Sequence, residues 1–229
     1  MVPKTEKLEL TKSTSSEIDA FLDRAQTRKT GRIIFAMDAT QSRQPSWDRA
    51  AHLQAEMFQA VESLGSLEVQ LVFYRGFGEC KASNWTSNAS ELRRLMLSVQ
   101  CMGGLTQIGK ILTNALRQTE QRSVSAVIFI GDAFEENIDE VCHKAGQLGL
   151  QGTPALMFQE GQDQVAAQAF KEIARLTNGA YCPFDDLSAN ALKDLLSAAA
   201  VYAVGGLEAL DNMSAKGSGS LRRALPSLK

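Results

Sequence analysis

Short apolar runs alternate along the chain with longer segments in which apolar residues recur every three or four positions. A short run bounded by turn residues predicts a buried strand, and a three-to-four spacing predicts a helix with one buried face. The predicted strands lie at 32–37, 67–74, 124–130, 154–158 and 180–183. A glycine-rich turn at 75–81 begins a short edge strand.

The predicted helices carry start and stop signals. Pro45 suits the first turn of a helix that runs to about Leu64, and Gly65 closes it. Asn178-Gly179 stops another helix in the same way. The helices are predicted at 15–28, 45–64, 89–99, 106–116, 135–148, 163–177 and 187–204.

Strands and helices alternate from Arg32 onward, which predicts an α/β fold. The expected architecture is doubly wound: a mostly parallel central sheet with right-handed crossovers and helices on both faces. We expect the domain to span 31–205, preceded by an N-terminal extension and helix at 1–30 and followed by a flexible basic tail at 206–229.

Composition narrows the class of protein. A length of 229 residues suits one large domain, and a net charge of -2 argues against broad electrostatic binding to nucleic acid. The first ten residues lack the apolar core of a signal peptide, and the longest apolar stretch, 195–207, is too short to cross a bilayer. The four cysteines are far apart in the sequence, which favours reduced thiols over disulfides or a zinc site. These features predict a cytoplasmic protein without a membrane partner.

Oxygen-bearing side chains follow two of the predicted strands. Asp38, Thr40 and Ser42 stand at alternate positions after the first strand, and Asp132 ends the strand that begins near 124. Thr106 follows a Gly-Gly loop at the start of a predicted helix. Ligands bind at the carboxyl ends of strands in open α/β sheets, and hard oxygen donors suit Mg²⁺, Ca²⁺ or Mn²⁺ rather than zinc.

These five residues, in this order and strand context, resemble the signature of the von Willebrand factor type A (vWA) domain and its metal-ion-dependent adhesion site (MIDAS). The family pattern is Asp-x-Ser-x-Ser, then a Thr, then an Asp, so Thr40 departs from it in type but keeps the hydroxyl. The resemblance implies a Rossmann-like fold and a Mg²⁺, Mn²⁺ or Ca²⁺ ion. It implies direct ligation by Thr40 and Ser42, contact through water by Asp38 and Asp132, and a Thr106 that joins or leaves as its loop moves.

Neutral hydroxyl ligands leave much of the divalent charge uncompensated, so such an ion seeks a further anion. In the vWA family this anion is an Asp or Glu carboxylate of a partner protein. The resemblance therefore implies a non-catalytic, metal-dependent protein-binding module. As a cytoplasmic protein, it would serve as a scaffold or adaptor in a multiprotein complex, such as a chaperone or ATPase assembly.

Two other functions compete with this interpretation. A Mg²⁺-dependent phosphotransfer enzyme would use Asp38. Such chemistry normally requires a second carboxylate close by as acid or base, but the position two residues after Asp38 holds Thr40. The chain contains neither a phosphate-binding GxxxxGK[ST] loop nor a GxSxG nucleophile motif. A metal-free interaction domain that has kept the loops is the second alternative.

Aromatic and charged residues border the predicted site. Trp47 is either a core residue or a contact residue, and Arg75 either pairs with Glu79 or reaches a partner carboxylate. An exposed contact role is the hypothesis for Phe77 and Phe134.

Two acidic and two histidine residues are assigned ordinary structural roles. Glu135 and Glu136 are expected in the first turn of the helix at 135–148, where the helix dipole favours acids. His52 and His143 stand in predicted helices without a second histidine nearby, which predicts surface positions or satisfied side chains.

Overall fold

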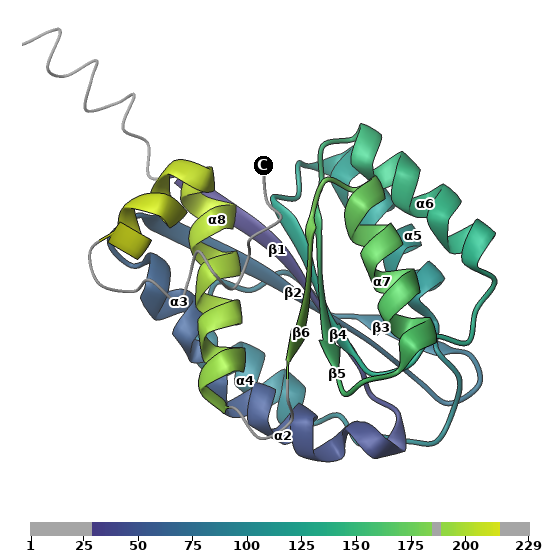
Figure 1. The fold of residues 1–229 in the computed structure, drawn as a ribbon. Helices are drawn as coiled ribbons and strands as arrows, with labels where there is room; N and C mark the ends of the chain where they lie inside the picture. The colour runs from purple at the N-terminus through teal and green to yellow at the C-terminus, as the bar shows by residue number, and fades with distance from the viewer. Residues whose placement is uncertain (1–28, 185–188, 216–229) are drawn as a thin grey trace, which may run out of the picture.

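A six-stranded sheet organises the described part of the chain, residues 29–184 and 189–215 of a computed structural model. Its strand order is β3-β2-β1-β4-β5-β6, and only the edge pair β2–β3 is antiparallel (Figure 1). The strands are β1 (Lys29–Asp38), β2 (Gly65–Arg75), β3 (Glu79–Ala82), β4 (Ala126–Gly131), β5 (Ala155–Glu160) and β6 (Ala180–Phe184).

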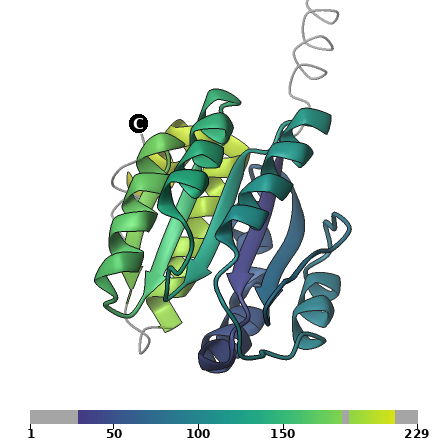
Figure 2. The ribbon, with the colours of Figure 1, turned by 90° about the vertical axis from the view of Figure 1, so that its right-hand side faces the viewer.

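Helices cover both faces of this sheet (Figures 1 and 2). One face carries α2 (Gln44–Leu53), α3 (Ala55–Val61), α4 (Ala89–Leu97) and α8 (Ala189–Ala215), with the short 3₁₀ turn η1 (Gln41–Arg43) ahead of α2. The other carries α5 (Ile108–Gln121), α6 (Ile138–Leu150) and α7 (Gln164–Leu176). The predicted doubly wound α/β fold is thus confirmed. Within the described ranges, no helix is both long and apolar enough to cross a membrane.

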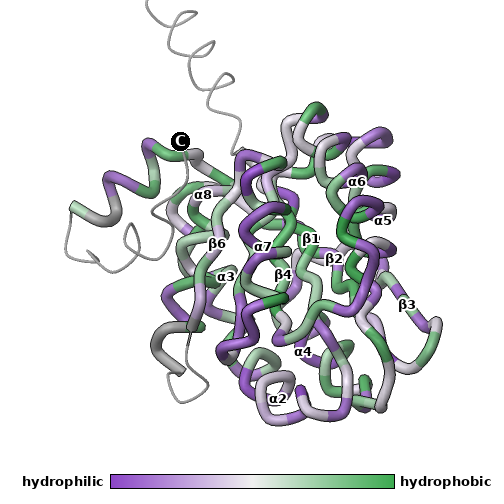
Figure 3. The backbone as a smooth tube through the Cα atoms, turned by 45° about the vertical axis from the view of Figure 1, so that its right-hand side comes forward, coloured by the Kyte–Doolittle hydropathy of each residue, from purple (hydrophilic) through white to green (hydrophobic). Residues whose placement is uncertain are grey.

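The central strand β1 is apolar on both sides because both faces of the sheet are covered. Ile33, Phe35 and Met37 are fully buried and pack into the apolar cluster under α2, α3 and α8. Ile34 and Ala36 pack on the opposite side, against α5 and its neighbours. Figure 3 shows the resulting apolar band of strands between the two helical layers. Side chains alternate along a strand, so the next even position, Asp38, leaves β1 on the α5 side.

Several helix boundaries differ from the predicted ones. The helix predicted at 45–64 is divided into α2 and α3 at Gln54, a polar residue that is buried between them. The last helix continues to Ala215 with a kink at Gly206, whose φ of 69° is accessible to glycine without strain. Residues 206–215, assigned from the sequence to the tail, therefore lie in α8. The helix predicted at 15–28 and the rest of the tail lie outside the described residues.

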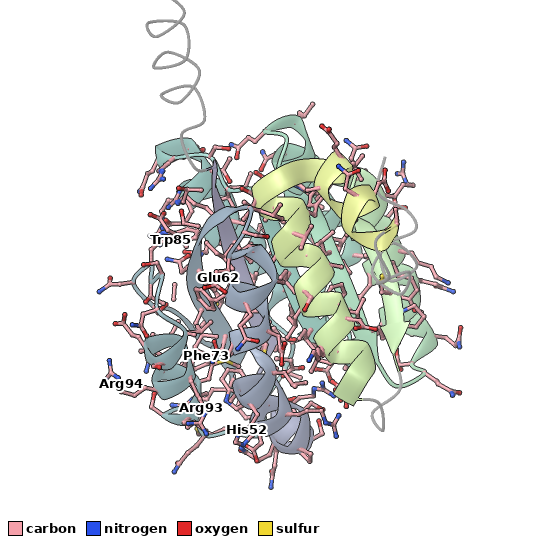
Figure 4. The ribbon with its side chains drawn as sticks, turned by 90° about the vertical axis from the view of Figure 1, so that its left-hand side faces the viewer. His52, Glu62, Phe73, Trp85, Arg93 and Arg94 are labelled. Atoms are coloured by element: carbon pink, nitrogen blue, oxygen red, sulfur yellow. The ribbon has the colours of Figure 1, made fainter. Side chains whose placement is uncertain are left out.

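The two histidines lie on the surface, as expected. His52 Nδ1 is 3.5 Å from Arg93 Nη2, so the side chains of α2 and α4 meet at this end of the molecule (Figure 4). His143 Nε2 lies 3.2 Å from Gln147 one helical turn further along α6.

The aromatic contacts of β4 generate a stability prediction. Phe129 is fully buried, stacks on Tyr74 with ring centroids 6.3 Å apart and meets Phe170 edge-on at 5.4 Å. We expect Phe129→Ala to lower the free energy of unfolding by about 3–5 kcal/mol, because a large buried ring is lost. Phe77→Ala is the matched control: its ring is 87% exposed, so the change should stay within about 0.5 kcal/mol. Urea titration followed by circular dichroism measures both, and equal losses would contradict the core assignment.

Candidate metal centre

The candidate site lies where the strand order reverses. From β1 the chain proceeds outward through β2 to β3, and then returns to place β4 on the other side of β1. Loops that leave two such strands in opposite directions open a crevice at their carboxyl ends, where ligands bind in this class of fold. Asp38 ends β1 and Asp132 directly follows β4, so both acids stand at this end of the sheet, where folds of this class place the crevice. The ends of β1 and β4 lie close together, since a Cβ placed on Gly131 would lie 3.6 Å from the Asp38 Cβ.

Asp38 is almost completely buried, and only one of its oxygens is used. Its Oδ1 accepts the backbone N–H of Thr40 at 2.7 Å, while its Oδ2 is buried without a hydrogen-bond partner. Burial raises the pKa of Asp38, the Thr40 amide opposes that rise, and the Asp132 charge adds to it. An ionised carboxylate in this position lacks a counter-charge on its free oxygen.

A second buried oxygen lies beside Asp38. The Tyr74 hydroxyl, on the neighbouring strand β2, is fully buried and interacts with the Asp38 carboxylate, although the two groups do not reach good hydrogen-bond geometry. Burial first, and then the charge of Asp38, raises the pKa of Tyr74 well above 10.0. The phenol therefore stays neutral, and neither the hydroxyl nor Asp38 Oδ2 has a well-formed hydrogen bond.

The first loop and the β4 loop meet at Asp132. The Ser42 hydroxyl donates to Asp132 Oδ2 at 3.4 Å, and Arg43 Nη1 lies 3.5 Å from the same oxygen. The side chain of Ser42 is exposed and that of Thr40 is half-buried, so both hydroxyls stand near the mouth of the crevice rather than in the core.

Thr106 is linked to this group through the β4 loop. Its hydroxyl accepts the backbone N–H of Glu135 at 2.9 Å, and its own N–H donates to a Glu135 carboxylate oxygen at 3.1 Å. Among the described residues, no hydrogen bond joins Thr106 directly to the other four predicted ligands. The structure thus brings Asp38, Thr40, Ser42 and Asp132 together by direct contacts or adjoining strands, and attaches Thr106 through Glu135.

The roles predicted for Glu135 and Glu136 are wrong in one respect. Both residues precede α6, whose N-cap is Asn137. Glu136 instead accepts the N–H groups of Ile108 and Gly109, at 2.5 and 2.9 Å, at the start of α5. Glu136 is therefore attracted to a helix N-terminus as predicted, but the helix is α5, which begins nearly thirty residues earlier in the chain, and not α6.

The sequence places Arg43 beside the first loop but does not show which acids it pairs with. Its side chain is 4% exposed, and its guanidinium pairs with Glu160, at the end of β5, as well as with Asp132. The Ser46 hydroxyl donates to the other oxygen of Glu160 at 2.5 Å. One guanidinium thus faces the carboxylates of Asp38, Asp132 and Glu160, which leaves a surplus of negative charge at the crevice.

Other bordering residues resolve the open alternatives. Trp47 is a core residue whose indole N–H donates to the Met96 carbonyl at 2.8 Å. Arg75 pairs with Glu79 through two nitrogens, at 2.9 and 3.1 Å. Phe77 is exposed as hypothesised, whereas the hypothesis of an exposed Phe134 is wrong because its ring is buried against the α5 side of the core.

The donor set fits a hard divalent cation. A buried, unpartnered carboxylate oxygen, two adjacent hydroxyls and a second carboxylate are oxygen ligands of the kind that Mg²⁺ and Mn²⁺ prefer. Within residues 29–184 and 189–215, no three His, Cys, Asp or Glu side chains converge on one point. A cation held here would therefore depend on the hydroxyls of Thr40 and Ser42 as much as on carboxylates.

Comparison with known proteins supports the fold. The sequence matches no family model and no curated protein. An aerotolerance-related membrane protein from Bacteroides fragilis aligns with 74% of this chain and 98% of its own, at a TM-score of 0.57 and 17% identity. The VWA domain of SpRpn10 aligns with 73% of this chain and 94% of its own, at a TM-score of 0.55 and 13% identity. The pilus adhesin SpaC from Lactobacillus rhamnosus GG aligns over 76% of this chain and 30% of the adhesin, at a TM-score of 0.59 and 13% identity. At these identities the likeness shows the fold alone: the chain has the fold of a vWA domain.

The burial of Asp38 generates a prediction about pH. Because its pKa is raised in the folded chain, Asp38 favours folding most below its ordinary value of 3.8, and this contribution is lost as the pH rises through the raised value. In EDTA, we expect wild type to lose stability relative to Asp38→Asn between pH 3 and pH 7. Urea titrations of both proteins across this range measure the difference. A relative gain by wild type would contradict the assignment.

The buried ion pair generates a second prediction. Arg43→Met leaves the buried Glu160 carboxylate without its cation, so we expect a loss of about 3–5 kcal/mol in the free energy of unfolding. Arg43→Met combined with Glu160→Gln removes both charges and should recover most of that loss. Chemical unfolding of the two single variants and the double variant gives the coupling. Additive losses would show that the pair does not hold the loop.

Proposed function

We propose that this chain is a non-catalytic protein-binding module that recognises its partner through a divalent cation, as a MIDAS does. The observation that carries the proposal is the buried Asp38 oxygen without a partner, two and four residues ahead of the hydroxyls of Thr40 and Ser42. A cation is the direct means of compensating that oxygen. The vWA-type fold of the chain supports the protein-binding role.

Each residue of the centre has a distinct task. Thr40 and Ser42 would hold Mg²⁺ or Mn²⁺ through their hydroxyls, Asp38 and Asp132 would hold its waters, and Thr106 would join when its loop approaches. The bound ion would supply a coordination position for a carboxylate oxygen of the partner. Arg43 keeps Asp132 and the first loop in place, because its guanidinium is fixed on the buried Glu160.

The cation would also select a partner that presents a negatively charged side chain. An Asp or Glu side chain is the group that completes a coordination shell of neutral hydroxyls, whereas an amide supplies no charge. A partner that presents a carboxylate would therefore bind only with metal, and a chelator would release it.

We place this module in the cytoplasm, as an adaptor in a multiprotein complex such as a chaperone or ATPase assembly. The four cysteines are free thiols in the described residues, as expected in a reducing compartment. Burial raises the pKa of Cys101, near the site, to about 11, so this thiol is protonated at neutral pH and poorly reactive.

The site chemistry favours binding over phosphotransfer. An enzyme that used Asp38 as nucleophile would need an acid–base partner, and the nearest candidate, Asp132, is engaged by Ser42 and Arg43. Asp38-dependent hydrolysis of an aryl phosphate would reverse this preference. A metal-free interaction domain remains the other alternative, and metal titration separates it from the proposal.

Metal binding is the decisive prediction. In calorimetric titrations with Mg²⁺ or Mn²⁺, we expect Asp38→Asn and Asp132→Asn to weaken binding by at least about tenfold, as is typical when the groups that hold bound water are lost. Thr40→Val should weaken it as well, because the hydroxyl is replaced by a methyl of equal size. Thr40→Ser keeps the hydroxyl and should retain binding.

A carboxylate far from the crevice serves as the control. Glu172 pairs with Arg175 on the surface of α7, so Glu172→Gln should bind metal like wild type. If wild type and Asp38→Asn give equal heats, the cation has no part in the function and the metal-free alternative takes its place.

A further inference from the structure

Three exposed apolar side chains stand beside the candidate metal centre. Phe77 is 87% exposed, Met102 is 48% exposed and Leu105 is 49% exposed. Phe77 lies in the β2–β3 turn, and the other two lie in the loop between α4 and α5. Large apolar side chains gathered in this way on a soluble protein mark interaction sites more often than isolated ones do. We call these three residues the apolar rim.

Backbone contacts bind the rim to the metal loop. The Leu105 N–H donates to the Gly76 carbonyl at 3.2 Å, directly before Phe77. The Met102 N–H donates to the Ala39 carbonyl at 3.0 Å, between the predicted ligands Asp38 and Thr40. The rim and the predicted ligands therefore share one continuous edge of the molecule.

The two rim loops are closely packed. A Cβ on Gly104 would lie 2.1 Å from the Gly76 oxygen, so glycine is required for the approach. The Gln107 side chain donates to both the Arg75 and Gly76 carbonyls at 3.3 Å, and Lys110 donates to the Gly78 carbonyl at 2.8 Å. A surface held by this many bonds is preorganised, which lowers the entropic cost of binding.

Lys110 offers a positive charge to an acidic partner at the rim. Lys110 Nζ has two acceptors, the Gly78 carbonyl and the Gln107 side-chain oxygen, and both are neutral. The nearby acid Glu79 is already engaged by Arg75 and Lys81. An acidic segment would thus meet the Lys110 ammonium at the rim and, under the proposed function, a cation beside it.

We propose that the apolar rim selects partners whose metal-binding Asp or Glu is flanked by bulky apolar side chains. The carboxylate reaches the cation, and the flanking side chains cover Phe77, Met102 and Leu105. The inference rests on the proposed function and adds the residues that surround the carboxylate in the partner. Charge alone would not distinguish one surface acid from another, whereas apolar neighbours make the choice specific.

Short peptides test this directly. Amide NMR titrations in Mg²⁺ compare Ac-Phe-Glu-Phe-NH₂ with Ac-Gly-Glu-Gly-NH₂ and with Ac-Phe-Gln-Phe-NH₂. We expect the first to bind at least about tenfold more tightly than the second, a difference of about 1.4 kcal/mol. The glutamine peptide should bind weakly, since it lacks the carboxylate.

Two variants locate the preference. The triple variant Phe77→Ser, Met102→Ser, Leu105→Ser should bind both glutamate peptides equally, whereas Leu150→Ser, which changes an equally exposed residue at the end of α6, should keep the preference. The amide spectra of the variants report whether each remains folded.

The outcomes separate the two proposals. Equal binding of the two glutamate peptides by a protein that binds Mg²⁺, or binding of neither, overturns the role of the rim and leaves the proposed function standing. A preference that survives the triple variant also overturns it. A rim-dependent preference that persists unchanged in EDTA supports the rim and overturns the metal dependence of the proposed function.

Discussion

The unpaired oxygen of Asp38 is the constraint on which the site depends. It stands at the end of a central strand whose side chains are buried on both faces, where water cannot solvate it. An isolated carboxylate in such a place costs several kcal/mol unless a cation or donors compensate it. Its other oxygen, Oδ1, already accepts the Thr40 N–H, which fixes the orientation of the side chain. A carboxylate kept at this cost is typical of a ligand-binding position rather than of a stabilising one.

Arg43 neutralises one of the carboxylates at this end of the sheet and leaves the others largely uncompensated. Its guanidinium neutralises the buried Glu160 and touches Asp132 only from 3.5 Å, so Asp132 keeps most of its capacity to hold a cation or its waters. The same pair fixes the loop after β1 to the end of β5, because Arg43 and Ser46 both reach Glu160. Asp38 feels the charge of Arg43 but forms no ion pair with it in the described residues. The buried carboxylate of Glu160 is thus neutralised by Arg43, whereas Asp38 and Asp132 together have less positive charge than negative charge around them.

The sequence predicts the strands and the two strand-end acids because these depend on local pattern. An apolar run followed by Asp38 or Asp132 is visible in one dimension, and the parallel sheet then brings the two ends together. Contacts between distant segments escape that reasoning. The periodicity around 135 extends a helix toward Glu136, but its carboxylate is captured by the start of α5, which no local pattern records. Arg43 looks like a loop residue until Glu160 arrives from β5.

The topology explains why charge and apolar surface meet at one edge. The β2–β3 turn and the loop before α5 both lie at the carboxyl side of the sheet, and glycine at position 104 lets their backbones touch. Phe77 and Leu105 are turned outward by that contact, since the space between the loops is filled by backbone. A cation at the crevice would supply strength and the need for an acid, while side chains a few residues away would supply discrimination. Because Met102 is bonded to Ala39, a shift of the metal loop would also move the rim, so the two parts of the surface would respond together to the ion.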